Sequence, residues 1–192
     1  MSLEIETLGT LDLTEHHKEK TIDKLIGFFG KDLRFLVERS WLDLGCGSNK
    51  SPDRFAPHAC RILHDFGVKV TGIDLAPNDD ETFENYQADL TNPHALDVLN
   101  GRKFDFIHHN ALTFAGGGME SPTLGHMIDE IGEKRFEMQL LFWASKFLEP
   151  NGIYFQEWHV WQKKDEGLKR LSAVGKIRIA RKIRDTMSRL RK

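Results

Sequence analysis

Glycines and acidic residues recur where apolar segments end in the first half of the chain. Gly45 and Gly47 follow the run WLDL, and glycines let a backbone turn tightly and approach a ligand closely. Asp74 ends the alternating segment VKVTGID, and its carboxylate can accept hydrogen bonds from both hydroxyls of a ribose. Asp89, near the end of the shorter segment NYQADL, is placed to meet the edge of a base. The glycines alone fit a dinucleotide, a phosphate or no ligand, and the two acids favour a nucleoside.

Two histidines and an asparagine near the end of another segment, FDFIHHN, are the candidates for catalysis. Because neighbouring side chains of a strand point to opposite faces, His108 and His109 cannot chelate one metal ion together. A neutral imidazole titrates near pH 6.5 and suits general-base catalysis. We therefore predict a catalytic role for His109, with Asn110 as a polar contact to the substrate. The nine histidines show no metal-ligand spacing, and the common hydrolase motifs do not occur.

These residues need a scaffold of alternating strands and helices. Apolar residues at helical spacing predict helices, and short alternating or apolar runs predict strands. The predicted helices cover residues 13–29, 56–66 and 133–148, and the predicted strands cover residues 41–44, 68–74, 85–90, 104–110 and 153–158, with a turn at 149–152. This alternation implies right-handed βαβ units, a mostly parallel sheet and the α/β fold class. In such folds, ligands bind outside the carboxyl ends of the strands, where the strand order reverses.

Five segments resemble, in order, the motifs of the class I S-adenosylmethionine-dependent methyltransferases. They are LDLGCG, TGIDL, ADL, FDFIHHNAL and LEPNGIYF. The resemblance implies a Rossmann-like, doubly wound sheet with strand order 3-2-1-4-5 and S-adenosyl-L-methionine as the cofactor. It implies the methionine part near Gly45 and Gly47 and the ribose on Asp74. The adenine would then lie near Leu75, with Asp89 at its amino group. The resemblance spans residues 41–158, and the expected cofactor-binding residues are Asp43, Gly45, Cys46, Gly47, Asp74, Leu75, Asp89 and Leu90.

Several of these residues also have a structural interpretation. Asp43 lies just inside its strand and can hydrogen-bond the glycine turn, and Cys46 can be a small filler between the glycines. Asp74 can cap the turn that follows it, and Asp89 can start a turn, as aspartate commonly does. Lys50 is either a solvated charge or a contact to the carboxylate of the cofactor.

Three features depart from the family pattern. The segment SNKSP stands where the family usually has another glycine or small residue. Gly45 and Asp74 lie 29 residues apart, against about twenty in dinucleotide-binding folds, so the loop before the first helix is enlarged. After residue 158 we find no convincing strand pair, so we expect the sheet to lack the usual C-terminal strands. An amphipathic basic helix from residue 166 to the end would then cover the exposed edge of the sheet.

Charge is distributed unevenly along this chain of 192 residues, whose net charge is −2. Residues 161–192 carry twelve Lys/Arg and three Asp/Glu, a net charge of +9, and the preceding residues carry a net charge of −11. The basic tail either packs on the acidic body or meets an anionic partner such as RNA. We expect a single domain, residues 1–192, with a helical lead-in at 1–40, a cofactor-binding core at 41–160 and the basic helical tail at 161–192.

The leading hypothesis is a methyltransferase that acts on an oxygen or nitrogen acceptor, either a small molecule or a macromolecule. The alternative is a methyltransferase-like domain without catalysis that binds a protein or RNA partner through its basic helix. Because no run reaches the length of a membrane span and no signal pattern occurs, we expect a cytoplasmic protein with no membrane contact. Cys46 and Cys60 are then expected to be free thiols.

Overall fold

The computed structural model describes residues 23, 33–50, 56–109, 132–156 and 159–171. Its centre is a seven-stranded sheet formed by β1 (Ser40–Leu44), β2 (Lys69–Asp74), β3 (Glu84–Gln87), β4 (Phe104–His109), β5 (Leu148–Gln156), β6 (His159–Lys164) and β7 (Gly167–Leu171). The described part also contains the helices α2 (His58–Asp65) and α4 (Glu133–Phe147) and the 3-10 turns η1 (Arg34–Leu36) and η3 (Ala95–Leu99). The predicted helix over residues 13–29 lies outside the described residues, apart from the helical Asp23.

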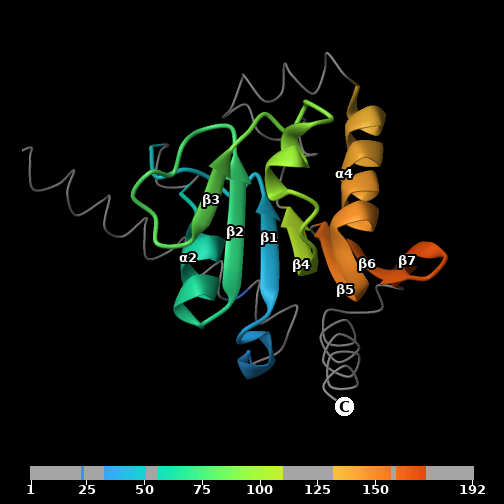
Figure 1. The fold of residues 1–192 in the computed structure, drawn as a ribbon, viewed down its shortest axis with the longest axis horizontal. Helices are drawn as coiled ribbons and strands as arrows, with labels where there is room; N and C mark the ends of the chain where they lie inside the picture. Colours follow the sequence, from blue (N-terminus) through green and yellow to red (C-terminus); the bar gives the residue numbers. More distant parts are fainter. Residues whose placement is uncertain (1–22, 24–32, 51–55, 110–131, 157–158, 172–192) are drawn as a thin grey trace, which may run out of the picture.

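The sheet brings the carboxyl ends of its first five strands to one edge. The strands lie in the order β3-β2-β1-β4-β5-β6-β7. β1 pairs in parallel with β2 and β4, and the pairs β2–β3 and β4–β5 are parallel too, so the arrowheads of β1 to β5 point to the same edge in Figure 1. The chain order reverses between β1 and β4, where α/β sheets hold their ligands. The predicted α/β class with a mostly parallel sheet is confirmed.

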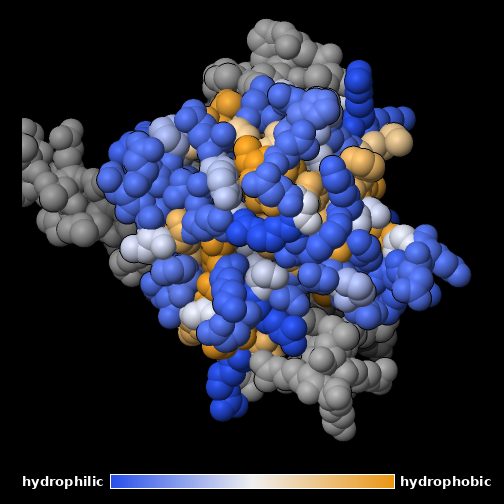
Figure 2. Space-filling view, viewed as in Figure 1, coloured by the Kyte–Doolittle hydropathy of each residue, from blue (hydrophilic) through white to orange (hydrophobic). Residues whose placement is uncertain are grey.

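Each face of the sheet carries its own apolar core, because alternate residues of a strand point to opposite faces. On one face, Trp41 of β1 packs in a cluster with Cys60 and Leu63 of α2. On the other face, the neighbouring Leu42 belongs to a cluster with Phe136 of α4. Figure 2 shows hydrophilic side chains over most of the visible surface, with apolar ones between them. Packing on both faces thus fixes the strand ends that carry the predicted site.

The predicted turn over residues 149–152 lies inside β5. Leu148 pairs with Phe104, but the next pair joins Ile153 to Phe106, so three additional residues loop out of β5. A Cβ at Gly152 would meet two backbone oxygens, at 2.9 and 3.1 Å. Because neither oxygen can move aside without shifting the backbone, the loop requires glycine at this position.

The C-terminal strands contradict the prediction of a sheet without them. β6 pairs antiparallel with β5, and β7 pairs antiparallel with β6, so both strands continue the sheet. The basic helical tail expected over residues 161–192 is therefore wrong for residues 161–164, which lie in β6, and for residues 167–171, which form β7. Leu168 and Leu171 suit a helix by their spacing, but β6 provides a strand partner for this segment. The remainder of the predicted helix, residues 172–192, lies outside the described residues.

Among the described residues, no helix has both the length and the apolar character that crossing a membrane requires.

Candidate functional site

The chain leaves β1 through a glycine turn, residues 45–50, at the carboxyl edge of the sheet. Gly45 and Gly47 have φ angles of 68° and 89°, which residues with a Cβ rarely adopt. The N–H groups of Gly45 and Cys46 both donate to the carbonyl oxygen of Ile73, at 2.8 and 3.1 Å. The glycine turn is therefore tied to the end of β2.

Asp74 closes β2 and binds the glycine turn. Its Oδ2 accepts a hydrogen bond from the N–H of Gly47 at 2.9 Å, and its Oδ1 accepts one from the N–H of Ala76 at 3.1 Å. Burial raises the pKa of Asp74, the backbone hydrogen bonds from Ala76 and Gly47 oppose that rise, and the nearby Asp43 adds to it. Each carboxylate oxygen keeps lone-pair capacity for another donor. The structure thus brings together two of the predicted residues, Gly47 and Asp74.

A buried asparagine that the sequence analysis missed holds the far half of the glycine turn. Asn78 lies in the loop after β2 and is 3% exposed. Its Nδ2 donates to the carbonyl oxygen of Gly47 at 2.8 Å, and its Oδ1 accepts the N–H of Asn49 at 2.9 Å. The hydroxyl of Ser48 donates to the carbonyl oxygen of Pro77 at 2.5 Å. The segment APND predicts only a turn, so no local signal points to these contacts with residues far away in the sequence.

Asp43 is buried under the carboxyl edge and pairs with a histidine rather than with the glycine turn. Its Oδ1 accepts a hydrogen bond from His108 Nδ1 at 2.8 Å, and its Oδ2 lies 3.5 Å from the thiol of Cys60. Burial, the neighbouring Cys46 and the Asp43 charge raise the pKa of Cys60 well above its usual range, so this thiol stays protonated. Cys46 also packs against Gly72, in agreement with its interpretation as a small filler.

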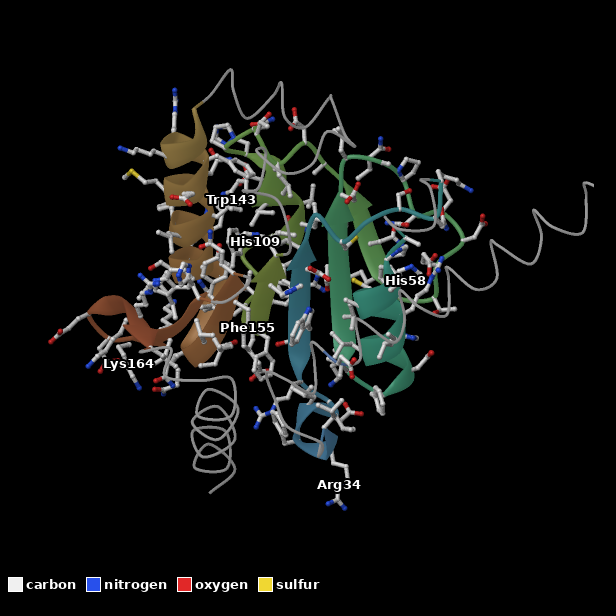
Figure 3. The ribbon with its side chains drawn as sticks, turned by 180° about the vertical axis from the view of Figure 1, so that it is seen from behind. Arg34, His58, His109, Trp143, Phe155 and Lys164 are labelled. Carbon is white, nitrogen blue, oxygen red and sulfur yellow. The ribbon has the colours of Figure 1, made fainter. Side chains whose placement is uncertain are left out.

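The two adjacent histidines of β4 have opposite environments. A carboxylate can only accept, so Nδ1 of His108 carries the hydrogen that Asp43 accepts. The side chain of His108 is 17% exposed. His109 is fully buried, its ring centroid lies 5.7 Å from that of Tyr154, and neither of its ring nitrogens has a hydrogen-bond partner within the described part of the chain. Figure 3 shows it at the end of β4, on the part of the sheet next to α4.

Burial, and secondly the neighbouring charge of His108, lowers the pKa of His109 to about 3. Since the unfolded chain has a histidine pKa of about 6.5, it binds the proton more tightly than the folded chain. The neutral His109 therefore favours folding above about pH 6.5, and this stability is lost as the pH falls toward 3. The catalytic role of His109 stays a prediction, but the reason given for it from the sequence, an imidazole that titrates near pH 6.5, does not hold for this buried ring.

The His109→Leu variant should remove this part of the acid sensitivity. In the wild-type chain the shift lowers the free energy of unfolding by about 2 kcal/mol between pH 7 and pH 5. Denaturant unfolding at both pH values should show this difference shrinking by about that amount in the variant. His94→Asn, at an exposed histidine, serves as the control and should leave the difference unchanged. Equal pH dependence in wild type and His109→Leu would contradict the assignment.

The remaining predicted residues lie in the neighbouring loops. Leu75 is 43% exposed and follows Asp74 directly, whereas Leu90 is buried against the α4 face. Asp89 Oδ1 accepts hydrogen bonds from the N–H and the hydroxyl of Thr91, at 2.9 and 2.7 Å, which is the turn geometry that its alternative interpretation implies. Asn110 lies outside the described residues.

The edge around the glycine turn is acidic. The glycine turn and the loop of residues 75–83 contain one basic residue, Lys50, and its ammonium group lies 3.2 Å from Asp80. The carboxylates of Asp43 and Asp74 lie beneath and beside the turn. In the part of the chain that the structure describes, no group of three His, Cys, Asp or Glu side chains could hold a metal ion. The arrangement therefore suits a neutral or cationic ligand that offers hydrogen-bond donors.

Comparison with known proteins gives structural neighbours only. No family model matches the sequence, and no curated protein matches it either. One similar solved structure is MycE, a methyltransferase from the mycinamycin biosynthetic pathway in complex with Mg and S-adenosylhomocysteine, at 18% identity and a TM-score of 0.39. That match covers 61% of this chain and 26% of MycE, so the chain spans about a quarter of the length of MycE.

Two further solved structures match over more of the chain. The epimerase Mth375 of Methanothermobacter thermautotrophicus is 13% identical, has a TM-score of 0.40, and is matched over 82% of this chain and 48% of its own. The 1,6-didemethyltoxoflavin-N1-methyltransferase of Burkholderia thailandensis, with bound 1,6-didemethyltoxoflavin and S-adenosylhomocysteine, is 12% identical and has a TM-score of 0.34. The match covers 97% of this chain and 80% of that enzyme. All three structures are less than 20% identical to this chain, and none of their TM-scores exceeds 0.40.

Proposed function

We propose that this chain is a methyltransferase that binds S-adenosyl-L-methionine on the glycine turn and transfers its methyl group to an oxygen or nitrogen acceptor. The observation that carries the proposal is how the backbone N–H groups of the turn are used. A dinucleotide fold leaves such groups free, because they cradle the pyrophosphate at the start of a helix.

In this chain, most backbone N–H groups of the glycine turn are already donated within the protein. The N–H groups of Gly45 and Cys46 donate to Ile73 O, and that of Gly47 donates to Asp74 Oδ2. The N–H of Asn49 donates to Asn78 Oδ1, and that of Lys50 donates to Ser48 Oγ. A pyrophosphate would therefore find few donors on this turn. A cofactor without phosphate groups, such as S-adenosylmethionine, does not need them.

The acidic edge also suits the charge of the cofactor. S-adenosylmethionine carries a positive sulfonium group, and carboxylates attract a cation most strongly where water is partly excluded. Asp43 and Asp74 supply two such carboxylates, whereas Lys50 is paired with Asp80. The charge distribution therefore supports a cationic cofactor over an anionic one.

Each expected contact can be given a role at this edge. Asp74 accepts the ribose hydroxyls, and Leu75 offers an exposed apolar side chain to the adenine. Oδ2 of Asp89, which takes no part in its hydrogen bonds to Thr91, accepts the adenine amino group. Asn49 Oδ1 is buried without a partner among the described residues, and it suits the ammonium group of the methionine part.

Catalysis in this proposal consists mainly of positioning. Methyl transfer is an in-line displacement, and holding the acceptor near contact distance from the methyl carbon supplies most of the acceleration. A protonated acceptor also needs a base. His109 and Asn110 stay the residues predicted from the sequence, and His108, with Asp43 on its Nδ1, offers a second imidazole.

The test is a thermal-shift comparison of two ligands. S-adenosylhomocysteine at a hundred times its Kd should stabilise the chain by about 2.7 kcal/mol and raise Tm by roughly 5–10 °C. NADH at the same concentration should leave Tm unchanged, because it needs free N–H groups for its pyrophosphate. A shift with NADH alone, or no shift with millimolar S-adenosylhomocysteine, would refute the proposed function.

A further inference from the structure

We infer that Asn78 is a positioning residue for the cofactor, one that holds the glycine turn in its binding shape in place of the missing third glycine. The inference rests on the proposed function, because it concerns the same site. It differs in content, since neither the motifs nor the resemblance assigns any role to the loop that carries Asn78.

The carboxamide of Asn78 makes the contacts that a rigid turn requires. Its two ends are used in opposite senses: Nδ2 donates to Gly47 O at 2.8 Å, and Oδ1 accepts from Asn49 N at 2.9 Å. Its side chain therefore closes a ring with the backbone of residues 47–49. Asparagine is mostly exposed in proteins, so burial to 3% exposure with both ends satisfied indicates a built contact.

A second contact fastens the same two segments. The hydroxyl of Ser48 is fully buried, donates to Pro77 O at 2.5 Å and accepts the N–H of Lys50 at 3.1 Å. Ser48 is the residue that stands just where the family pattern departs. In a dinucleotide fold, the helix that follows the glycine turn directly holds the turn in place. In this chain α2 begins only at His58, and Ser48 and Asn78 hold the turn instead.

The position of Asn78 in the chain links the two halves of the site. It follows Asp74 by four residues, so one short loop carries both the ribose acceptor and the group that holds the glycine turn. Because Asp74 also accepts the N–H of Gly47, the two loops are joined on both sides of that residue. A turn that is ordered before binding loses less entropy when the ligand arrives, which strengthens affinity.

The experiment measures S-adenosylhomocysteine binding by titration calorimetry in the wild-type chain and in three variants. Asn78→Ala removes the hydrogen bonds with Gly47 O and Asn49 N, and the longer one from Nδ2 to Cys46 Sγ at 3.7 Å. It should raise Kd by about 10–100-fold, with a less favourable binding entropy. Asn78→Asp keeps an acceptor for Asn49 N–H but places a buried carboxylate oxygen against Gly47 O, so its Kd should rise at least as much as that of Asn78→Ala. Asn85→Ala, at an asparagine whose side chain donates to Phe83 O at 3.2 Å, is the matched control and should bind within twofold of wild type.

Hydrogen exchange separates positioning from general stability. In the ligand-free Asn78→Ala variant, the amides of residues 45–50 should exchange faster than in wild type, while those of β1 keep their protection. S-adenosylhomocysteine should restore the protection of the turn. A change spread equally over the sheet would mean that Asn78 is merely structural and would overturn the inference.

Each remaining outcome also decides the question. If folded Asn78→Ala binds S-adenosylhomocysteine within twofold of wild type, the inference is wrong. If that variant does not fold, Asn78→Asp and Ser48→Ala replace it, and wild-type affinity in both would refute the inference in the same way. If the wild-type chain itself does not bind S-adenosylhomocysteine, the proposed function fails, and the exchange of residues 45–50 still shows whether Asn78 holds the turn.

Discussion

Replacing Asp74 by alanine should weaken the binding of S-adenosylhomocysteine by at least 100-fold. A hydrogen bond to a charged group contributes about 1.5–3 kcal/mol, and the proposed site has two of them between this carboxylate and the ribose hydroxyls. Two such bonds correspond to two or more factors of ten in Kd. The variant also loses the acceptor for Gly47 N–H, so the glycine turn is loosened at the same time.

Calorimetric titration of three variants isolates the role of this carboxylate. Asp74→Asn keeps the shape and one acceptor oxygen, so its affinity should lie between those of wild type and Asp74→Ala. Asp79→Ala, at an exposed acid of the same loop, controls for the loss of one negative charge near the site and should bind nearly as well as wild type. Unchanged affinity in folded Asp74→Ala would refute the ribose assignment.

The parts of the site that follow from the sequence are those that depend on neighbouring residues in the chain. A glycine after an apolar run predicts a tight turn whatever surrounds it, and Gly45 and Gly47 have the positive φ angles of such a turn. Parallel strands bring their carboxyl ends to one edge, so Asp74 could be expected beside the turn. The hydrogen bond from Gly47 N to Asp74 Oδ2 shows that the two residues do lie side by side.

Asn78 could not be predicted because its role depends on a long-range contact. Asparagine in the segment APND is an ordinary turn residue. Asn78 acquires its role from the hydrogen bond to the carbonyl oxygen of Gly47, 31 residues earlier in the chain. Periodicity and composition carry no information on which loops meet. The same limit applies to the two histidines: the alternation of a strand predicts that His108 and His109 differ, and only the packing of α4 and Tyr154 decides which one is buried.

The C-terminal strands were missed because a short segment fits two periods at once. Leu168 and Leu171 stand three apart, as on a helix, and the basic residues between them suit a solvated helix face or a strand edge equally well. The neighbouring strand decides whether such a segment forms a helix or a strand. β6 pairs with β5, with Trp161 opposite Tyr154, and β7 then extends the sheet from β6. Pairing energy of this kind comes from tertiary contacts and overrides local preference.

Replacing Gly72 by valine should destabilise the chain by about 3 kcal/mol, because β2 has no room for a side chain beneath the glycine turn. A Cβ at this position would lie 2.8 Å from the sulfur of Cys46 and 2.9 Å from the ring of Phe83. Thermal unfolding should show Tm lowered by roughly 6–12 °C. A Tm within 2 °C of wild type would contradict this account of the packing.

A double-mutant cycle tests whether this clash reaches the site. Gly72→Ala introduces the Cβ alone, and Cys46→Ala removes the sulfur that it would meet, so the double variant should recover at least 0.5 kcal/mol relative to the sum of the single variants. Phe83 still limits the space, so the recovery should be incomplete. Gly72→Ala alone should also weaken S-adenosylhomocysteine binding, since Cys46 lies between the two glycines of the turn. Additive stabilities, with unchanged affinity, would mean that Gly72 acts on the core and leaves the glycine turn undisturbed.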